Sequence, residues 1–186
     1  MINYYFHQLG YIYDFDTLDK LASILDLGAI GSRVYLEKNG IKYKSSFKLD
    51  IPYDKEWLYY PDGVHEDRVS LSDPNNRFVR RSIERKDSSQ VACYSYNFLT
   101  LLVSRNVPIV SSENTKGLAL GEVQVMDRID NSYIIGILVP FDDNALLDER
   151  NLNIIENIKN ICKFRNYDLN IYNYEGKILN ERNKEM

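Results

Sequence analysis

The order of apolar and polar positions predicts a strand, a helix and a glycine stop at the start of the chain. The segment Ile2 to His7 is aromatic and β-branched, which suits a half-buried strand, and Gly10 marks a turn after it. A helix is expected from near Thr17, capped by Asp16, because apolar residues then recur at helical spacing: Leu18, Leu21, Ala22 and Leu25. Gly28 is placed to end this helix in a left-handed conformation.

The next part of the chain predicts a hairpin and an isolated strand. Ser32 to Leu36 and Ile41 to Leu49 are strand-like and flank Lys38-Asn39-Gly40. An Asn-Gly pair between two extended runs is typical of a tight β-hairpin. Arg68 to Ser72 is predicted as a short strand that Asp73-Pro74 ends.

The second half of the chain predicts mostly strands. Ser95 to Arg105 fits either a helical face or a strand, whereas Val107 to Val110 is expected to be a strand. Leu118 to Met126 and Tyr133 to Pro140 are predicted strands, and the second is apolar on both faces. The short connection Asp127 to Ser132 favours an antiparallel hairpin between them.

The last unit combines one helix with one strand. An apolar stripe predicts a helix within residues 149–165: Leu152, Ile155, Ile158, Ile161 and Cys162. Leu169 to Tyr172 is a final strand and Gly176 marks a turn. The pattern as a whole predicts one α+β domain over residues 1–179, with two packed, mostly antiparallel sheets and few helices. The charged tail over 180–186 is expected to be frayed.

Composition narrows the class of protein. The 186 residues carry 23 basic and 27 acidic side chains, so a surface devoted entirely to nucleic acid is not expected. The basic cluster from Arg77 to Lys86 is either a local nucleic-acid patch or a solvated loop. Cys93 and Cys162 are predicted to be free thiols, and no metal-ligand spacing is present.

The apolar runs and the N-terminus bear on where the protein is located. No apolar run is long enough to span a membrane, and the N-terminus lacks the basic and long apolar regions of a signal peptide. The chain is expected to be cytoplasmic, or secreted into a host cell without a classical signal peptide.

Candidate chemistry centres on a carboxylate in an apolar run. Glu122 is the one charged residue between Lys116 and Asp127, and burial of a carboxylate is costly unless it has a partner or a function. His7 ends the first predicted strand. Ser70 and Ser72 alternate with apolar residues, so both hydroxyls face the same side of the predicted strand Arg68 to Ser72.

The order of these pieces resembles the ADP-ribosyltransferase superfamily. The pieces are Phe6-His7 with the following helix and Gly28-Ala29-Ile30, the strand Val69 to Ser72, and the run Leu120 to Val125. The pattern is most similar to the histidine-containing branch. That branch includes poly-ADP-ribose polymerase catalytic domains, tRNA 2′-phosphotransferases and bacterial DNA-targeting toxins.

The resemblance implies that NAD is the substrate. ADP-ribose would pass to a macromolecular acceptor, protein or nucleic acid, in a bacterial toxin or effector, or to water in an NAD glycohydrolase. Glu122 and His7 would be catalytic, with Glu122 stabilising the oxocarbenium-like ribose. The residues implied to bind NAD are His7 at the ribose, Ser72 at the nicotinamide, Phe78 or Tyr94 stacked on its ring, and Arg33 at the pyrophosphate.

The sequence departs from the family pattern at one position, and it also allows a second function. Leu120 stands where the arginine-specific branch has Glu or Gln, and Gln124 follows Glu122 instead, so arginine is a less expected acceptor. The alternative function is a non-catalytic protein-binding module, such as an immunity or inhibitor protein, because an acidic, tyrosine-rich surface suits a protein interface.

Overall fold

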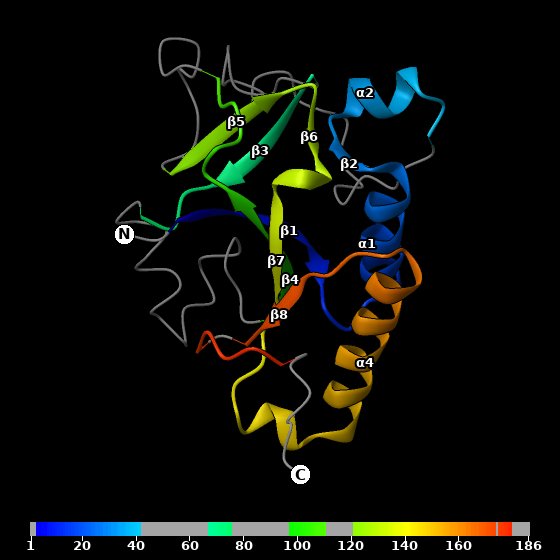
Figure 1. The fold of residues 1–186 in the computed structure, drawn as a ribbon, viewed down its shortest axis with the longest axis vertical. Coiled ribbons are helices and arrows are strands. Elements are labelled where there is room, and N and C mark those ends of the chain that lie inside the picture. The colour runs from blue at the N-terminus through cyan, green and yellow to red at the C-terminus, as the bar shows by residue number, and fades with distance from the viewer. Residues whose placement is uncertain (1–2, 42–66, 76–96, 111–120, 174, 180–186) are drawn as a thin grey trace, which may run out of the picture.

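A six-stranded sheet forms the centre of the molecule (Figure 1), with strands in the order β5-β3-β1-β4-β7-β8. The computed structural model describes residues 3–41, 67–75, 97–110, 121–173 and 175–179. All neighbouring strands are antiparallel except β7 and β8, which are parallel. The strands of this sheet are β1 (Tyr4–Tyr11), β3 (Arg68–Ser72), β4 (Phe98–Ser104), β5 (Glu122–Met126), β7 (Ile134–Leu138) and β8 (Asn170–Tyr172).

Strand β1 is paired very differently on its two sides. With β4 it is aligned along its whole length, with a bulge between Gln8 and Gly10. With β3 it is aligned at one pair, Phe6 opposite Ser72. We call the line between β1 and β3 the seam. The predicted strand at this position is confirmed, but it runs on through Gly10, whose φ of +151° keeps it in the strand at the bulge where a turn was predicted.

Two helices, α1 (Phe15–Leu27) and α4 (Glu149–Phe164), cover one face of the sheet and confirm both predicted helices. Their buried apolar side chains belong to one core cluster that also includes buried residues from every strand of the sheet. The buried helical residues of this core are Leu21, Leu25, Ile155, Ile158 and Cys162. Burial raises the pKa of the Cys162 thiol to about 11, as fits an unreactive core cysteine.

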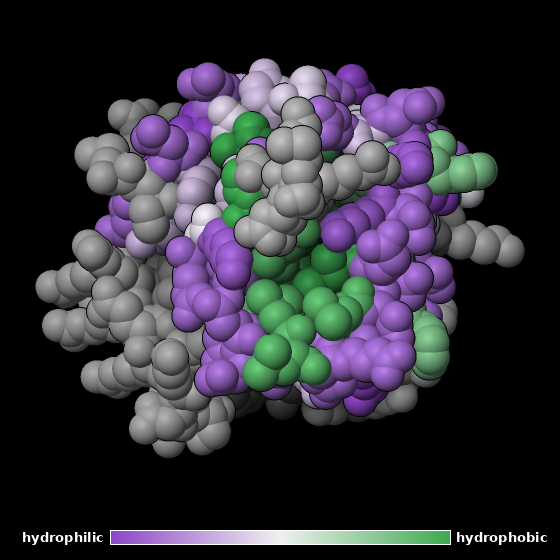
Figure 2. Space-filling model, turned by 60° about the horizontal axis from the view of Figure 1, so that its bottom comes forward, coloured by the Kyte–Doolittle hydropathy of each residue, from purple (hydrophilic) through white to green (hydrophobic). Residues whose placement is uncertain are grey.

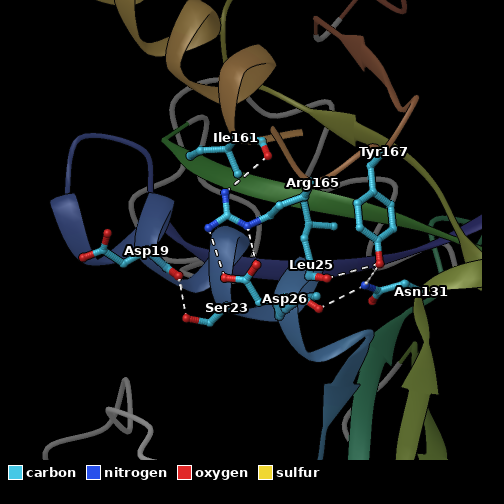
Figure 3. A network of polar contacts seen from close by, with 9 residues as sticks. Asp19, Ser23, Leu25, Asp26, Asn131, Ile161, Arg165 and Tyr167 are labelled. Atoms are coloured by element: carbon cyan, nitrogen blue, oxygen red, sulfur yellow. Dashed lines mark hydrogen bonds and ion pairs between the residues drawn. The ribbon is translucent and has the colours of Figure 1, made fainter. Parts of the chain in front are cut away.

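The C-terminal end of α4 is tied to α1 by polar contacts (Figure 3). Arg165 donates from Nε and Nη2 to the two carboxylate oxygens of Asp26, over 2.7 and 3.0 Å. The buried Asn131 donates to the carbonyl of Ile24 and to the Tyr167 hydroxyl. The Asn131 amide is a second donor to the Ile24 carbonyl beside the Gly28 N–H, and the Tyr167 hydroxyl donates to the Leu25 carbonyl in the last turn of α1.

The predicted strand Ser32 to Leu36 is wrong. The structure has a short helix there, α2 (Arg33–Lys38), and the Ser32 hydroxyl accepts from the Tyr35 N–H as its N-cap. The predicted hairpin turn is also wrong, because Asn39 caps the end of α2 and Gly40 follows with a φ of +65°. Its second strand, Ile41 to Leu49, lies outside the described residues beyond Ile41.

The connection after β5 also differs from the prediction. Instead of a hairpin with β7, the chain forms β6 (Arg128–Asp130), which pairs with β2 (Ala29–Gly31) in a separate two-stranded sheet. Strand β5 therefore lies at one edge of the large sheet and β7 near the other. Val107 to Val110 is no strand but makes one isolated bridge, from Ile109 to Val125. The ambiguous stretch Ser95 to Arg105 contains β4.

The predicted fold class, α+β with few helices and mostly antiparallel strands, is confirmed. The two sheets are unequal, with six and two strands. No helix among the described residues is long and apolar enough to cross a membrane. The proposed extent of the domain, 1–179, stays a prediction.

The end of the molecule where α4 begins carries exposed apolar side chains. Figure 2 brings this end forward and shows an apolar patch between polar residues. Leu147, in the short helix η4 (Ala145–Leu147), and Leu152 of α4 are the exposed large apolar residues of the elements here. In Figure 1 this end lies opposite the β3–β5 end, so the apolar patch is separate from the polar residues of those strands.

Replacement of Gly28 tests how the end of α1 is specified. Gly28 has a φ of +82° and donates its N–H to the Ile24 carbonyl, and a Cβ there would meet no atom within 4 Å. Gly28→Ala should therefore cost about 1–2 kcal/mol through backbone strain alone. Gly28→Asn is the matched control and should cost less, because Asn tolerates this conformation. Urea unfolding measures both, and equal losses would contradict the explanation.

Candidate functional site

A row of polar side chains runs along one face of β3 and β5. Directly opposite residues of an antiparallel pair point to the same face, and here Ser72 lies opposite Glu122 and Ser70 opposite Gln124. Arg68 continues the row on β3, whereas Val69 and Leu71 point into the core on the other face. The strand pattern thus places hydroxyl, carboxylate, amide and guanidinium groups on the face that α1 and α4 do not cover.

Ser70 holds the carboxylate of Glu122. Its hydroxyl donates to Oε1 of Glu122 over 2.5 Å, diagonally across the two strands. Such a charge-assisted bond is stronger than one between neutral groups and orients the carboxylate. The residue predicted to work beside Glu122 was Ser72, which lies directly opposite it. The alternation of Ser70 and Ser72 is visible in the sequence. The diagonal contact between Ser70 and Glu122 depends on how β3 and β5 are paired, which the sequence does not show.

His7 meets the same serine from the other side of the seam. Its Nδ1 lies 3.2 Å from the Ser70 carbonyl, which accepts, so Nδ1 carries the proton. Strand alternation puts the imidazole on the helix-covered face with Tyr5 and Leu9, opposite to Glu122. Neighbouring strands are about 4.8 Å apart, so β1 and β5 are separated by roughly 10 Å. His7 and Glu122 are therefore joined through Ser70, one to its backbone and the other to its side chain.

The surroundings of His7 disfavour its charged form. Burial is the largest cause and lowers the pKa of His7 below 6.5. The bond to the Ser70 carbonyl acts in the opposite direction, and the nearby ammonium of Lys20 lowers the pKa further. Lys20 itself donates to the Leu9 carbonyl at the β1 bulge, over 3.3 Å. The imidazole in the seam is therefore neutral at pH 7.

Gln124 and Arg68 are hydrogen-bonded to each other at the end of the polar row away from Glu122. The side chain of Gln124 is 2% exposed, and its Oε1 accepts from Nη1 of Arg68 over 3.2 Å. A buried amide needs such a partner, because an unsatisfied polar group in a core is costly. Gln124, two residues after Glu122, is therefore held in place by Arg68 on the neighbouring strand β3.

Of the other predicted NAD-binding residues, only Arg33 is among the described residues, and it lies away from this cluster. Arg33 begins α2, next to Ser32, whose N–H donates to the carbonyl of Asp127 at the far end of β5. At about 3.3 Å per residue, that end is roughly 17 Å from Glu122. Phe78 and Tyr94, the candidates for stacking, lie outside the described residues, as do Cys93 and the basic cluster from Arg77 to Lys86.

The cluster on β3, β5 and β1 combines several kinds of polar group. Within the described ranges, no group of three or more His, Cys, Asp or Glu side chains is arranged to hold a metal ion. The cluster instead offers a carboxylate oriented by a hydroxyl, a second hydroxyl opposite it, and a neutral imidazole one strand away. A carboxylate held in this way can stabilise positive charge that develops on a bound molecule.

Comparison with known proteins gives structural likenesses alone. No protein-family model matches the chain, and no curated protein matches it. The structure is similar to that of Thermus sp. 2.9 DarT in complex with carba-NAD+, with 12% identity and a TM-score of 0.46, over 92% of this chain and 94% of that one. It is similar to the same protein in complex with NAD+ with 13% identity and a TM-score of 0.41, over 84% and 90% of the two chains.

The burial of His7 predicts a pH dependence of stability. Its folded-state pKa is lowered from 6.5, so the unfolded chain takes up this proton more readily. The free energy of unfolding should therefore fall as the pH drops below 6.5 toward the folded-state pKa, and the loss is absent above 6.5. Urea unfolding at pH 7.5 and 5.5 measures this. His7→Gln is the control that should lose part of the pH dependence, and an unchanged dependence would contradict the assignment.

Proposed function

We propose that this protein transfers ADP-ribose from NAD+ to a macromolecular acceptor, protein or nucleic acid. The observation that supports the proposal is that Ser70 contacts both His7 and Glu122, on three adjacent strands. These are the two residues to which the resemblance assigns catalysis. A role as a bacterial toxin or effector is part of the same proposal.

The proposed mechanism uses Glu122 as the group that stabilises charge. The bond between nicotinamide and C1′ of the ribose breaks, and nicotinamide leaves with the electron pair. The ribose then carries positive charge, which a preorganised carboxylate stabilises. The Ser70 hydroxyl keeps Oε1 in place, so little reorganisation is needed during the reaction.

The second half of the reaction uses the same carboxylate as a base. A nucleophile of the acceptor forms a bond to C1′, and its proton passes to Glu122. Water in place of the acceptor gives NAD glycohydrolysis, the close variant of the reaction. His7, which contacts Ser70 across the seam, is proposed to hydrogen-bond the ribose, and Ser72 to line the nicotinamide site.

Removal of the Glu122 charge tests the reaction. Glu122→Gln keeps the shape of the side chain and should lower kcat for NAD+ consumption by about 100-fold or more, because the neutral amide does not stabilise the oxocarbenium-like state. Release of nicotinamide, followed by chromatography, is the measurement. Glu156→Gln, at an exposed position on α4, is the matched control and should retain full activity. Equal rates in wild type and Glu122→Gln would overturn the proposal.

Binding of NAD+ separates the proposed enzyme from the alternative protein-binding module. A ligand that binds the folded state alone raises the melting temperature. The wild-type protein should therefore melt at a higher temperature with millimolar NAD+. No shift together with no nicotinamide release would favour a non-catalytic module.

The two serines should differ in their kinetic effects. Ser70→Ala removes the bond that orients Glu122 and should lower kcat about tenfold, which corresponds to about 1.4 kcal/mol of transition-state stabilisation. Ser72→Ala should mainly raise KM for NAD+, as expected for a residue that lines the binding site. Steady-state kinetics on both variants makes the comparison. A larger loss of kcat in Ser72→Ala would reverse the assignment.

A further inference from the structure

An ion pair lies at the end of the seam, next to the proposed site. Arg105, in the turn after β4, donates from Nη1 and Nη2 to the carboxylate of Asp73, the residue directly after β3. Its guanidinium also lies 4.5 Å from the centroid of the Tyr5 ring on β1. Because β1 lies between β4 and β3, this pair crosses the central strand and joins the strands on either side of it.

The pair lies on the helix-covered face. In the β1–β4 register Tyr5 is opposite Val103, and Arg105, just after β4, places its guanidinium over the ring of the buried Tyr5. Tyr5 is buried in the core, and the side chains of Arg105 and Asp73 are 24% and 26% exposed. Two accepting carboxylate oxygens and an aromatic ring hold the guanidinium, which makes the contact more specific than a single exposed ion pair.

Asp73 also holds the residue before Glu122. Its backbone N–H donates to the Gly121 carbonyl over 2.7 Å, and Gly121 has a φ of +84°. Its carboxylate, besides binding Arg105, accepts from the N–H of Asn75 over 2.9 Å. The ends of β3 and β5 that carry Ser72 and Glu122 are thus attached to Arg105 through one residue.

We propose that Arg105 is a positioning residue that, through Asp73, holds β3 and β5 against β1 and so keeps His7, Ser70 and Glu122 in register across the seam. The inference rests on the proposed function for its catalytic consequence. The need for such a contact follows from the pairing of β1, which aligns with β3 at Phe6 and Ser72 alone. The bond from His7 to the Ser70 carbonyl crosses the same seam, so it depends on the same alignment.

The first test measures the pKa of His7 at the seam and needs no NAD+. The chain has two histidines, His7 and His65, so His7→Gln assigns the ring signals of His7 in a proton NMR titration. Arg105→Gln should admit water to the seam and raise the pKa of His7 toward 6.5, because burial is the main cause of its lowering. Arg105→Lys keeps the charge and should restore part of the difference. An unchanged titration of His7 in a folded Arg105→Gln protein would overturn the proposal.

A matched control is available on the other side of the molecule. Arg165 makes a similar two-donor pair with Asp26, lies 5.7 Å from the Phe164 ring, and joins α4 to α1 (Figure 3). Arg165→Gln should destabilise the protein without a change in the titration of His7. If both variants shift His7 equally, Arg105 has a general structural role and the proposal fails. If Arg105→Gln does not fold, Asp73→Asn and Arg105→Lys are used in the same comparison.

The second test reads the reaction. Arg105→Gln should lower kcat for nicotinamide release by about 10- to 100-fold, because Glu122 is misplaced relative to the other groups at the seam. A wild-type protein without NAD+ turnover would overturn the proposed function and leave the NMR result to decide the role of Arg105. Normal kcat in Arg105→Gln, with active wild type, would overturn the positioning role.

Discussion

The unequal pairing of β1 is the constraint on which the rest of the structure depends. One side of this strand is fully aligned with β4, so β1, β4, β7 and β8 form a continuous half of the sheet. The other side meets β3 at one aligned pair, and β3 and β5 form a two-stranded unit beyond it. All six strands are in order, but hydrogen bonding between β1 and β3 is incomplete, and the polar row of β3 and β5 begins on the β3 side of this seam.

One face of the sheet carries the apolar core, and the other carries the polar groups of the candidate site. On one face, α1 and α4 bury a continuous apolar core, which supplies most of the driving force for folding. On the other, β3 and β5 carry two serines and a carboxylate, groups that would be costly inside that core, and the buried amide of Gln124 is paired with Arg68. By strand alternation His7 lies on the apolar face, but its imidazole contacts the backbone carbonyl of Ser70, whose side chain lies on the polar face. A polar cluster can thus be rigid without being built into the apolar core.

Much of the local structure could be predicted because local signals decide it. The strand Arg68 to Ser72, the helix over 149–165 and the left-handed end of α1 at Gly28 all follow from periodicity and from glycine. The errors arose where one signal serves two structures. Ser32 caps a helix although the residues after it suit a strand, and Asn39-Gly40 ends that helix instead of turning a hairpin.

The candidate site could be predicted in its residue types but not in its contacts. The sequence shows two serines on one strand face and a glutamate that opens another strand, and both strands exist. The partner of Glu122 depends on register, which arises from pairing between residues about fifty positions apart. The ion pair of Arg105 joins a turn to the end of a strand across a third strand, and no local pattern encodes such a meeting.

The position of β1 in the middle of the sheet also affects how the chain can fold. Its neighbours come from residues 68–72 and 98–104, and β5, the edge strand beyond β3, comes from residues 122–126. The first strand therefore cannot pair along its whole length until residues 98–104 are available, and this pairing closes a long loop. Such high contact order slows folding, and it leaves the aromatic edges of β1 exposed while its partners are still missing.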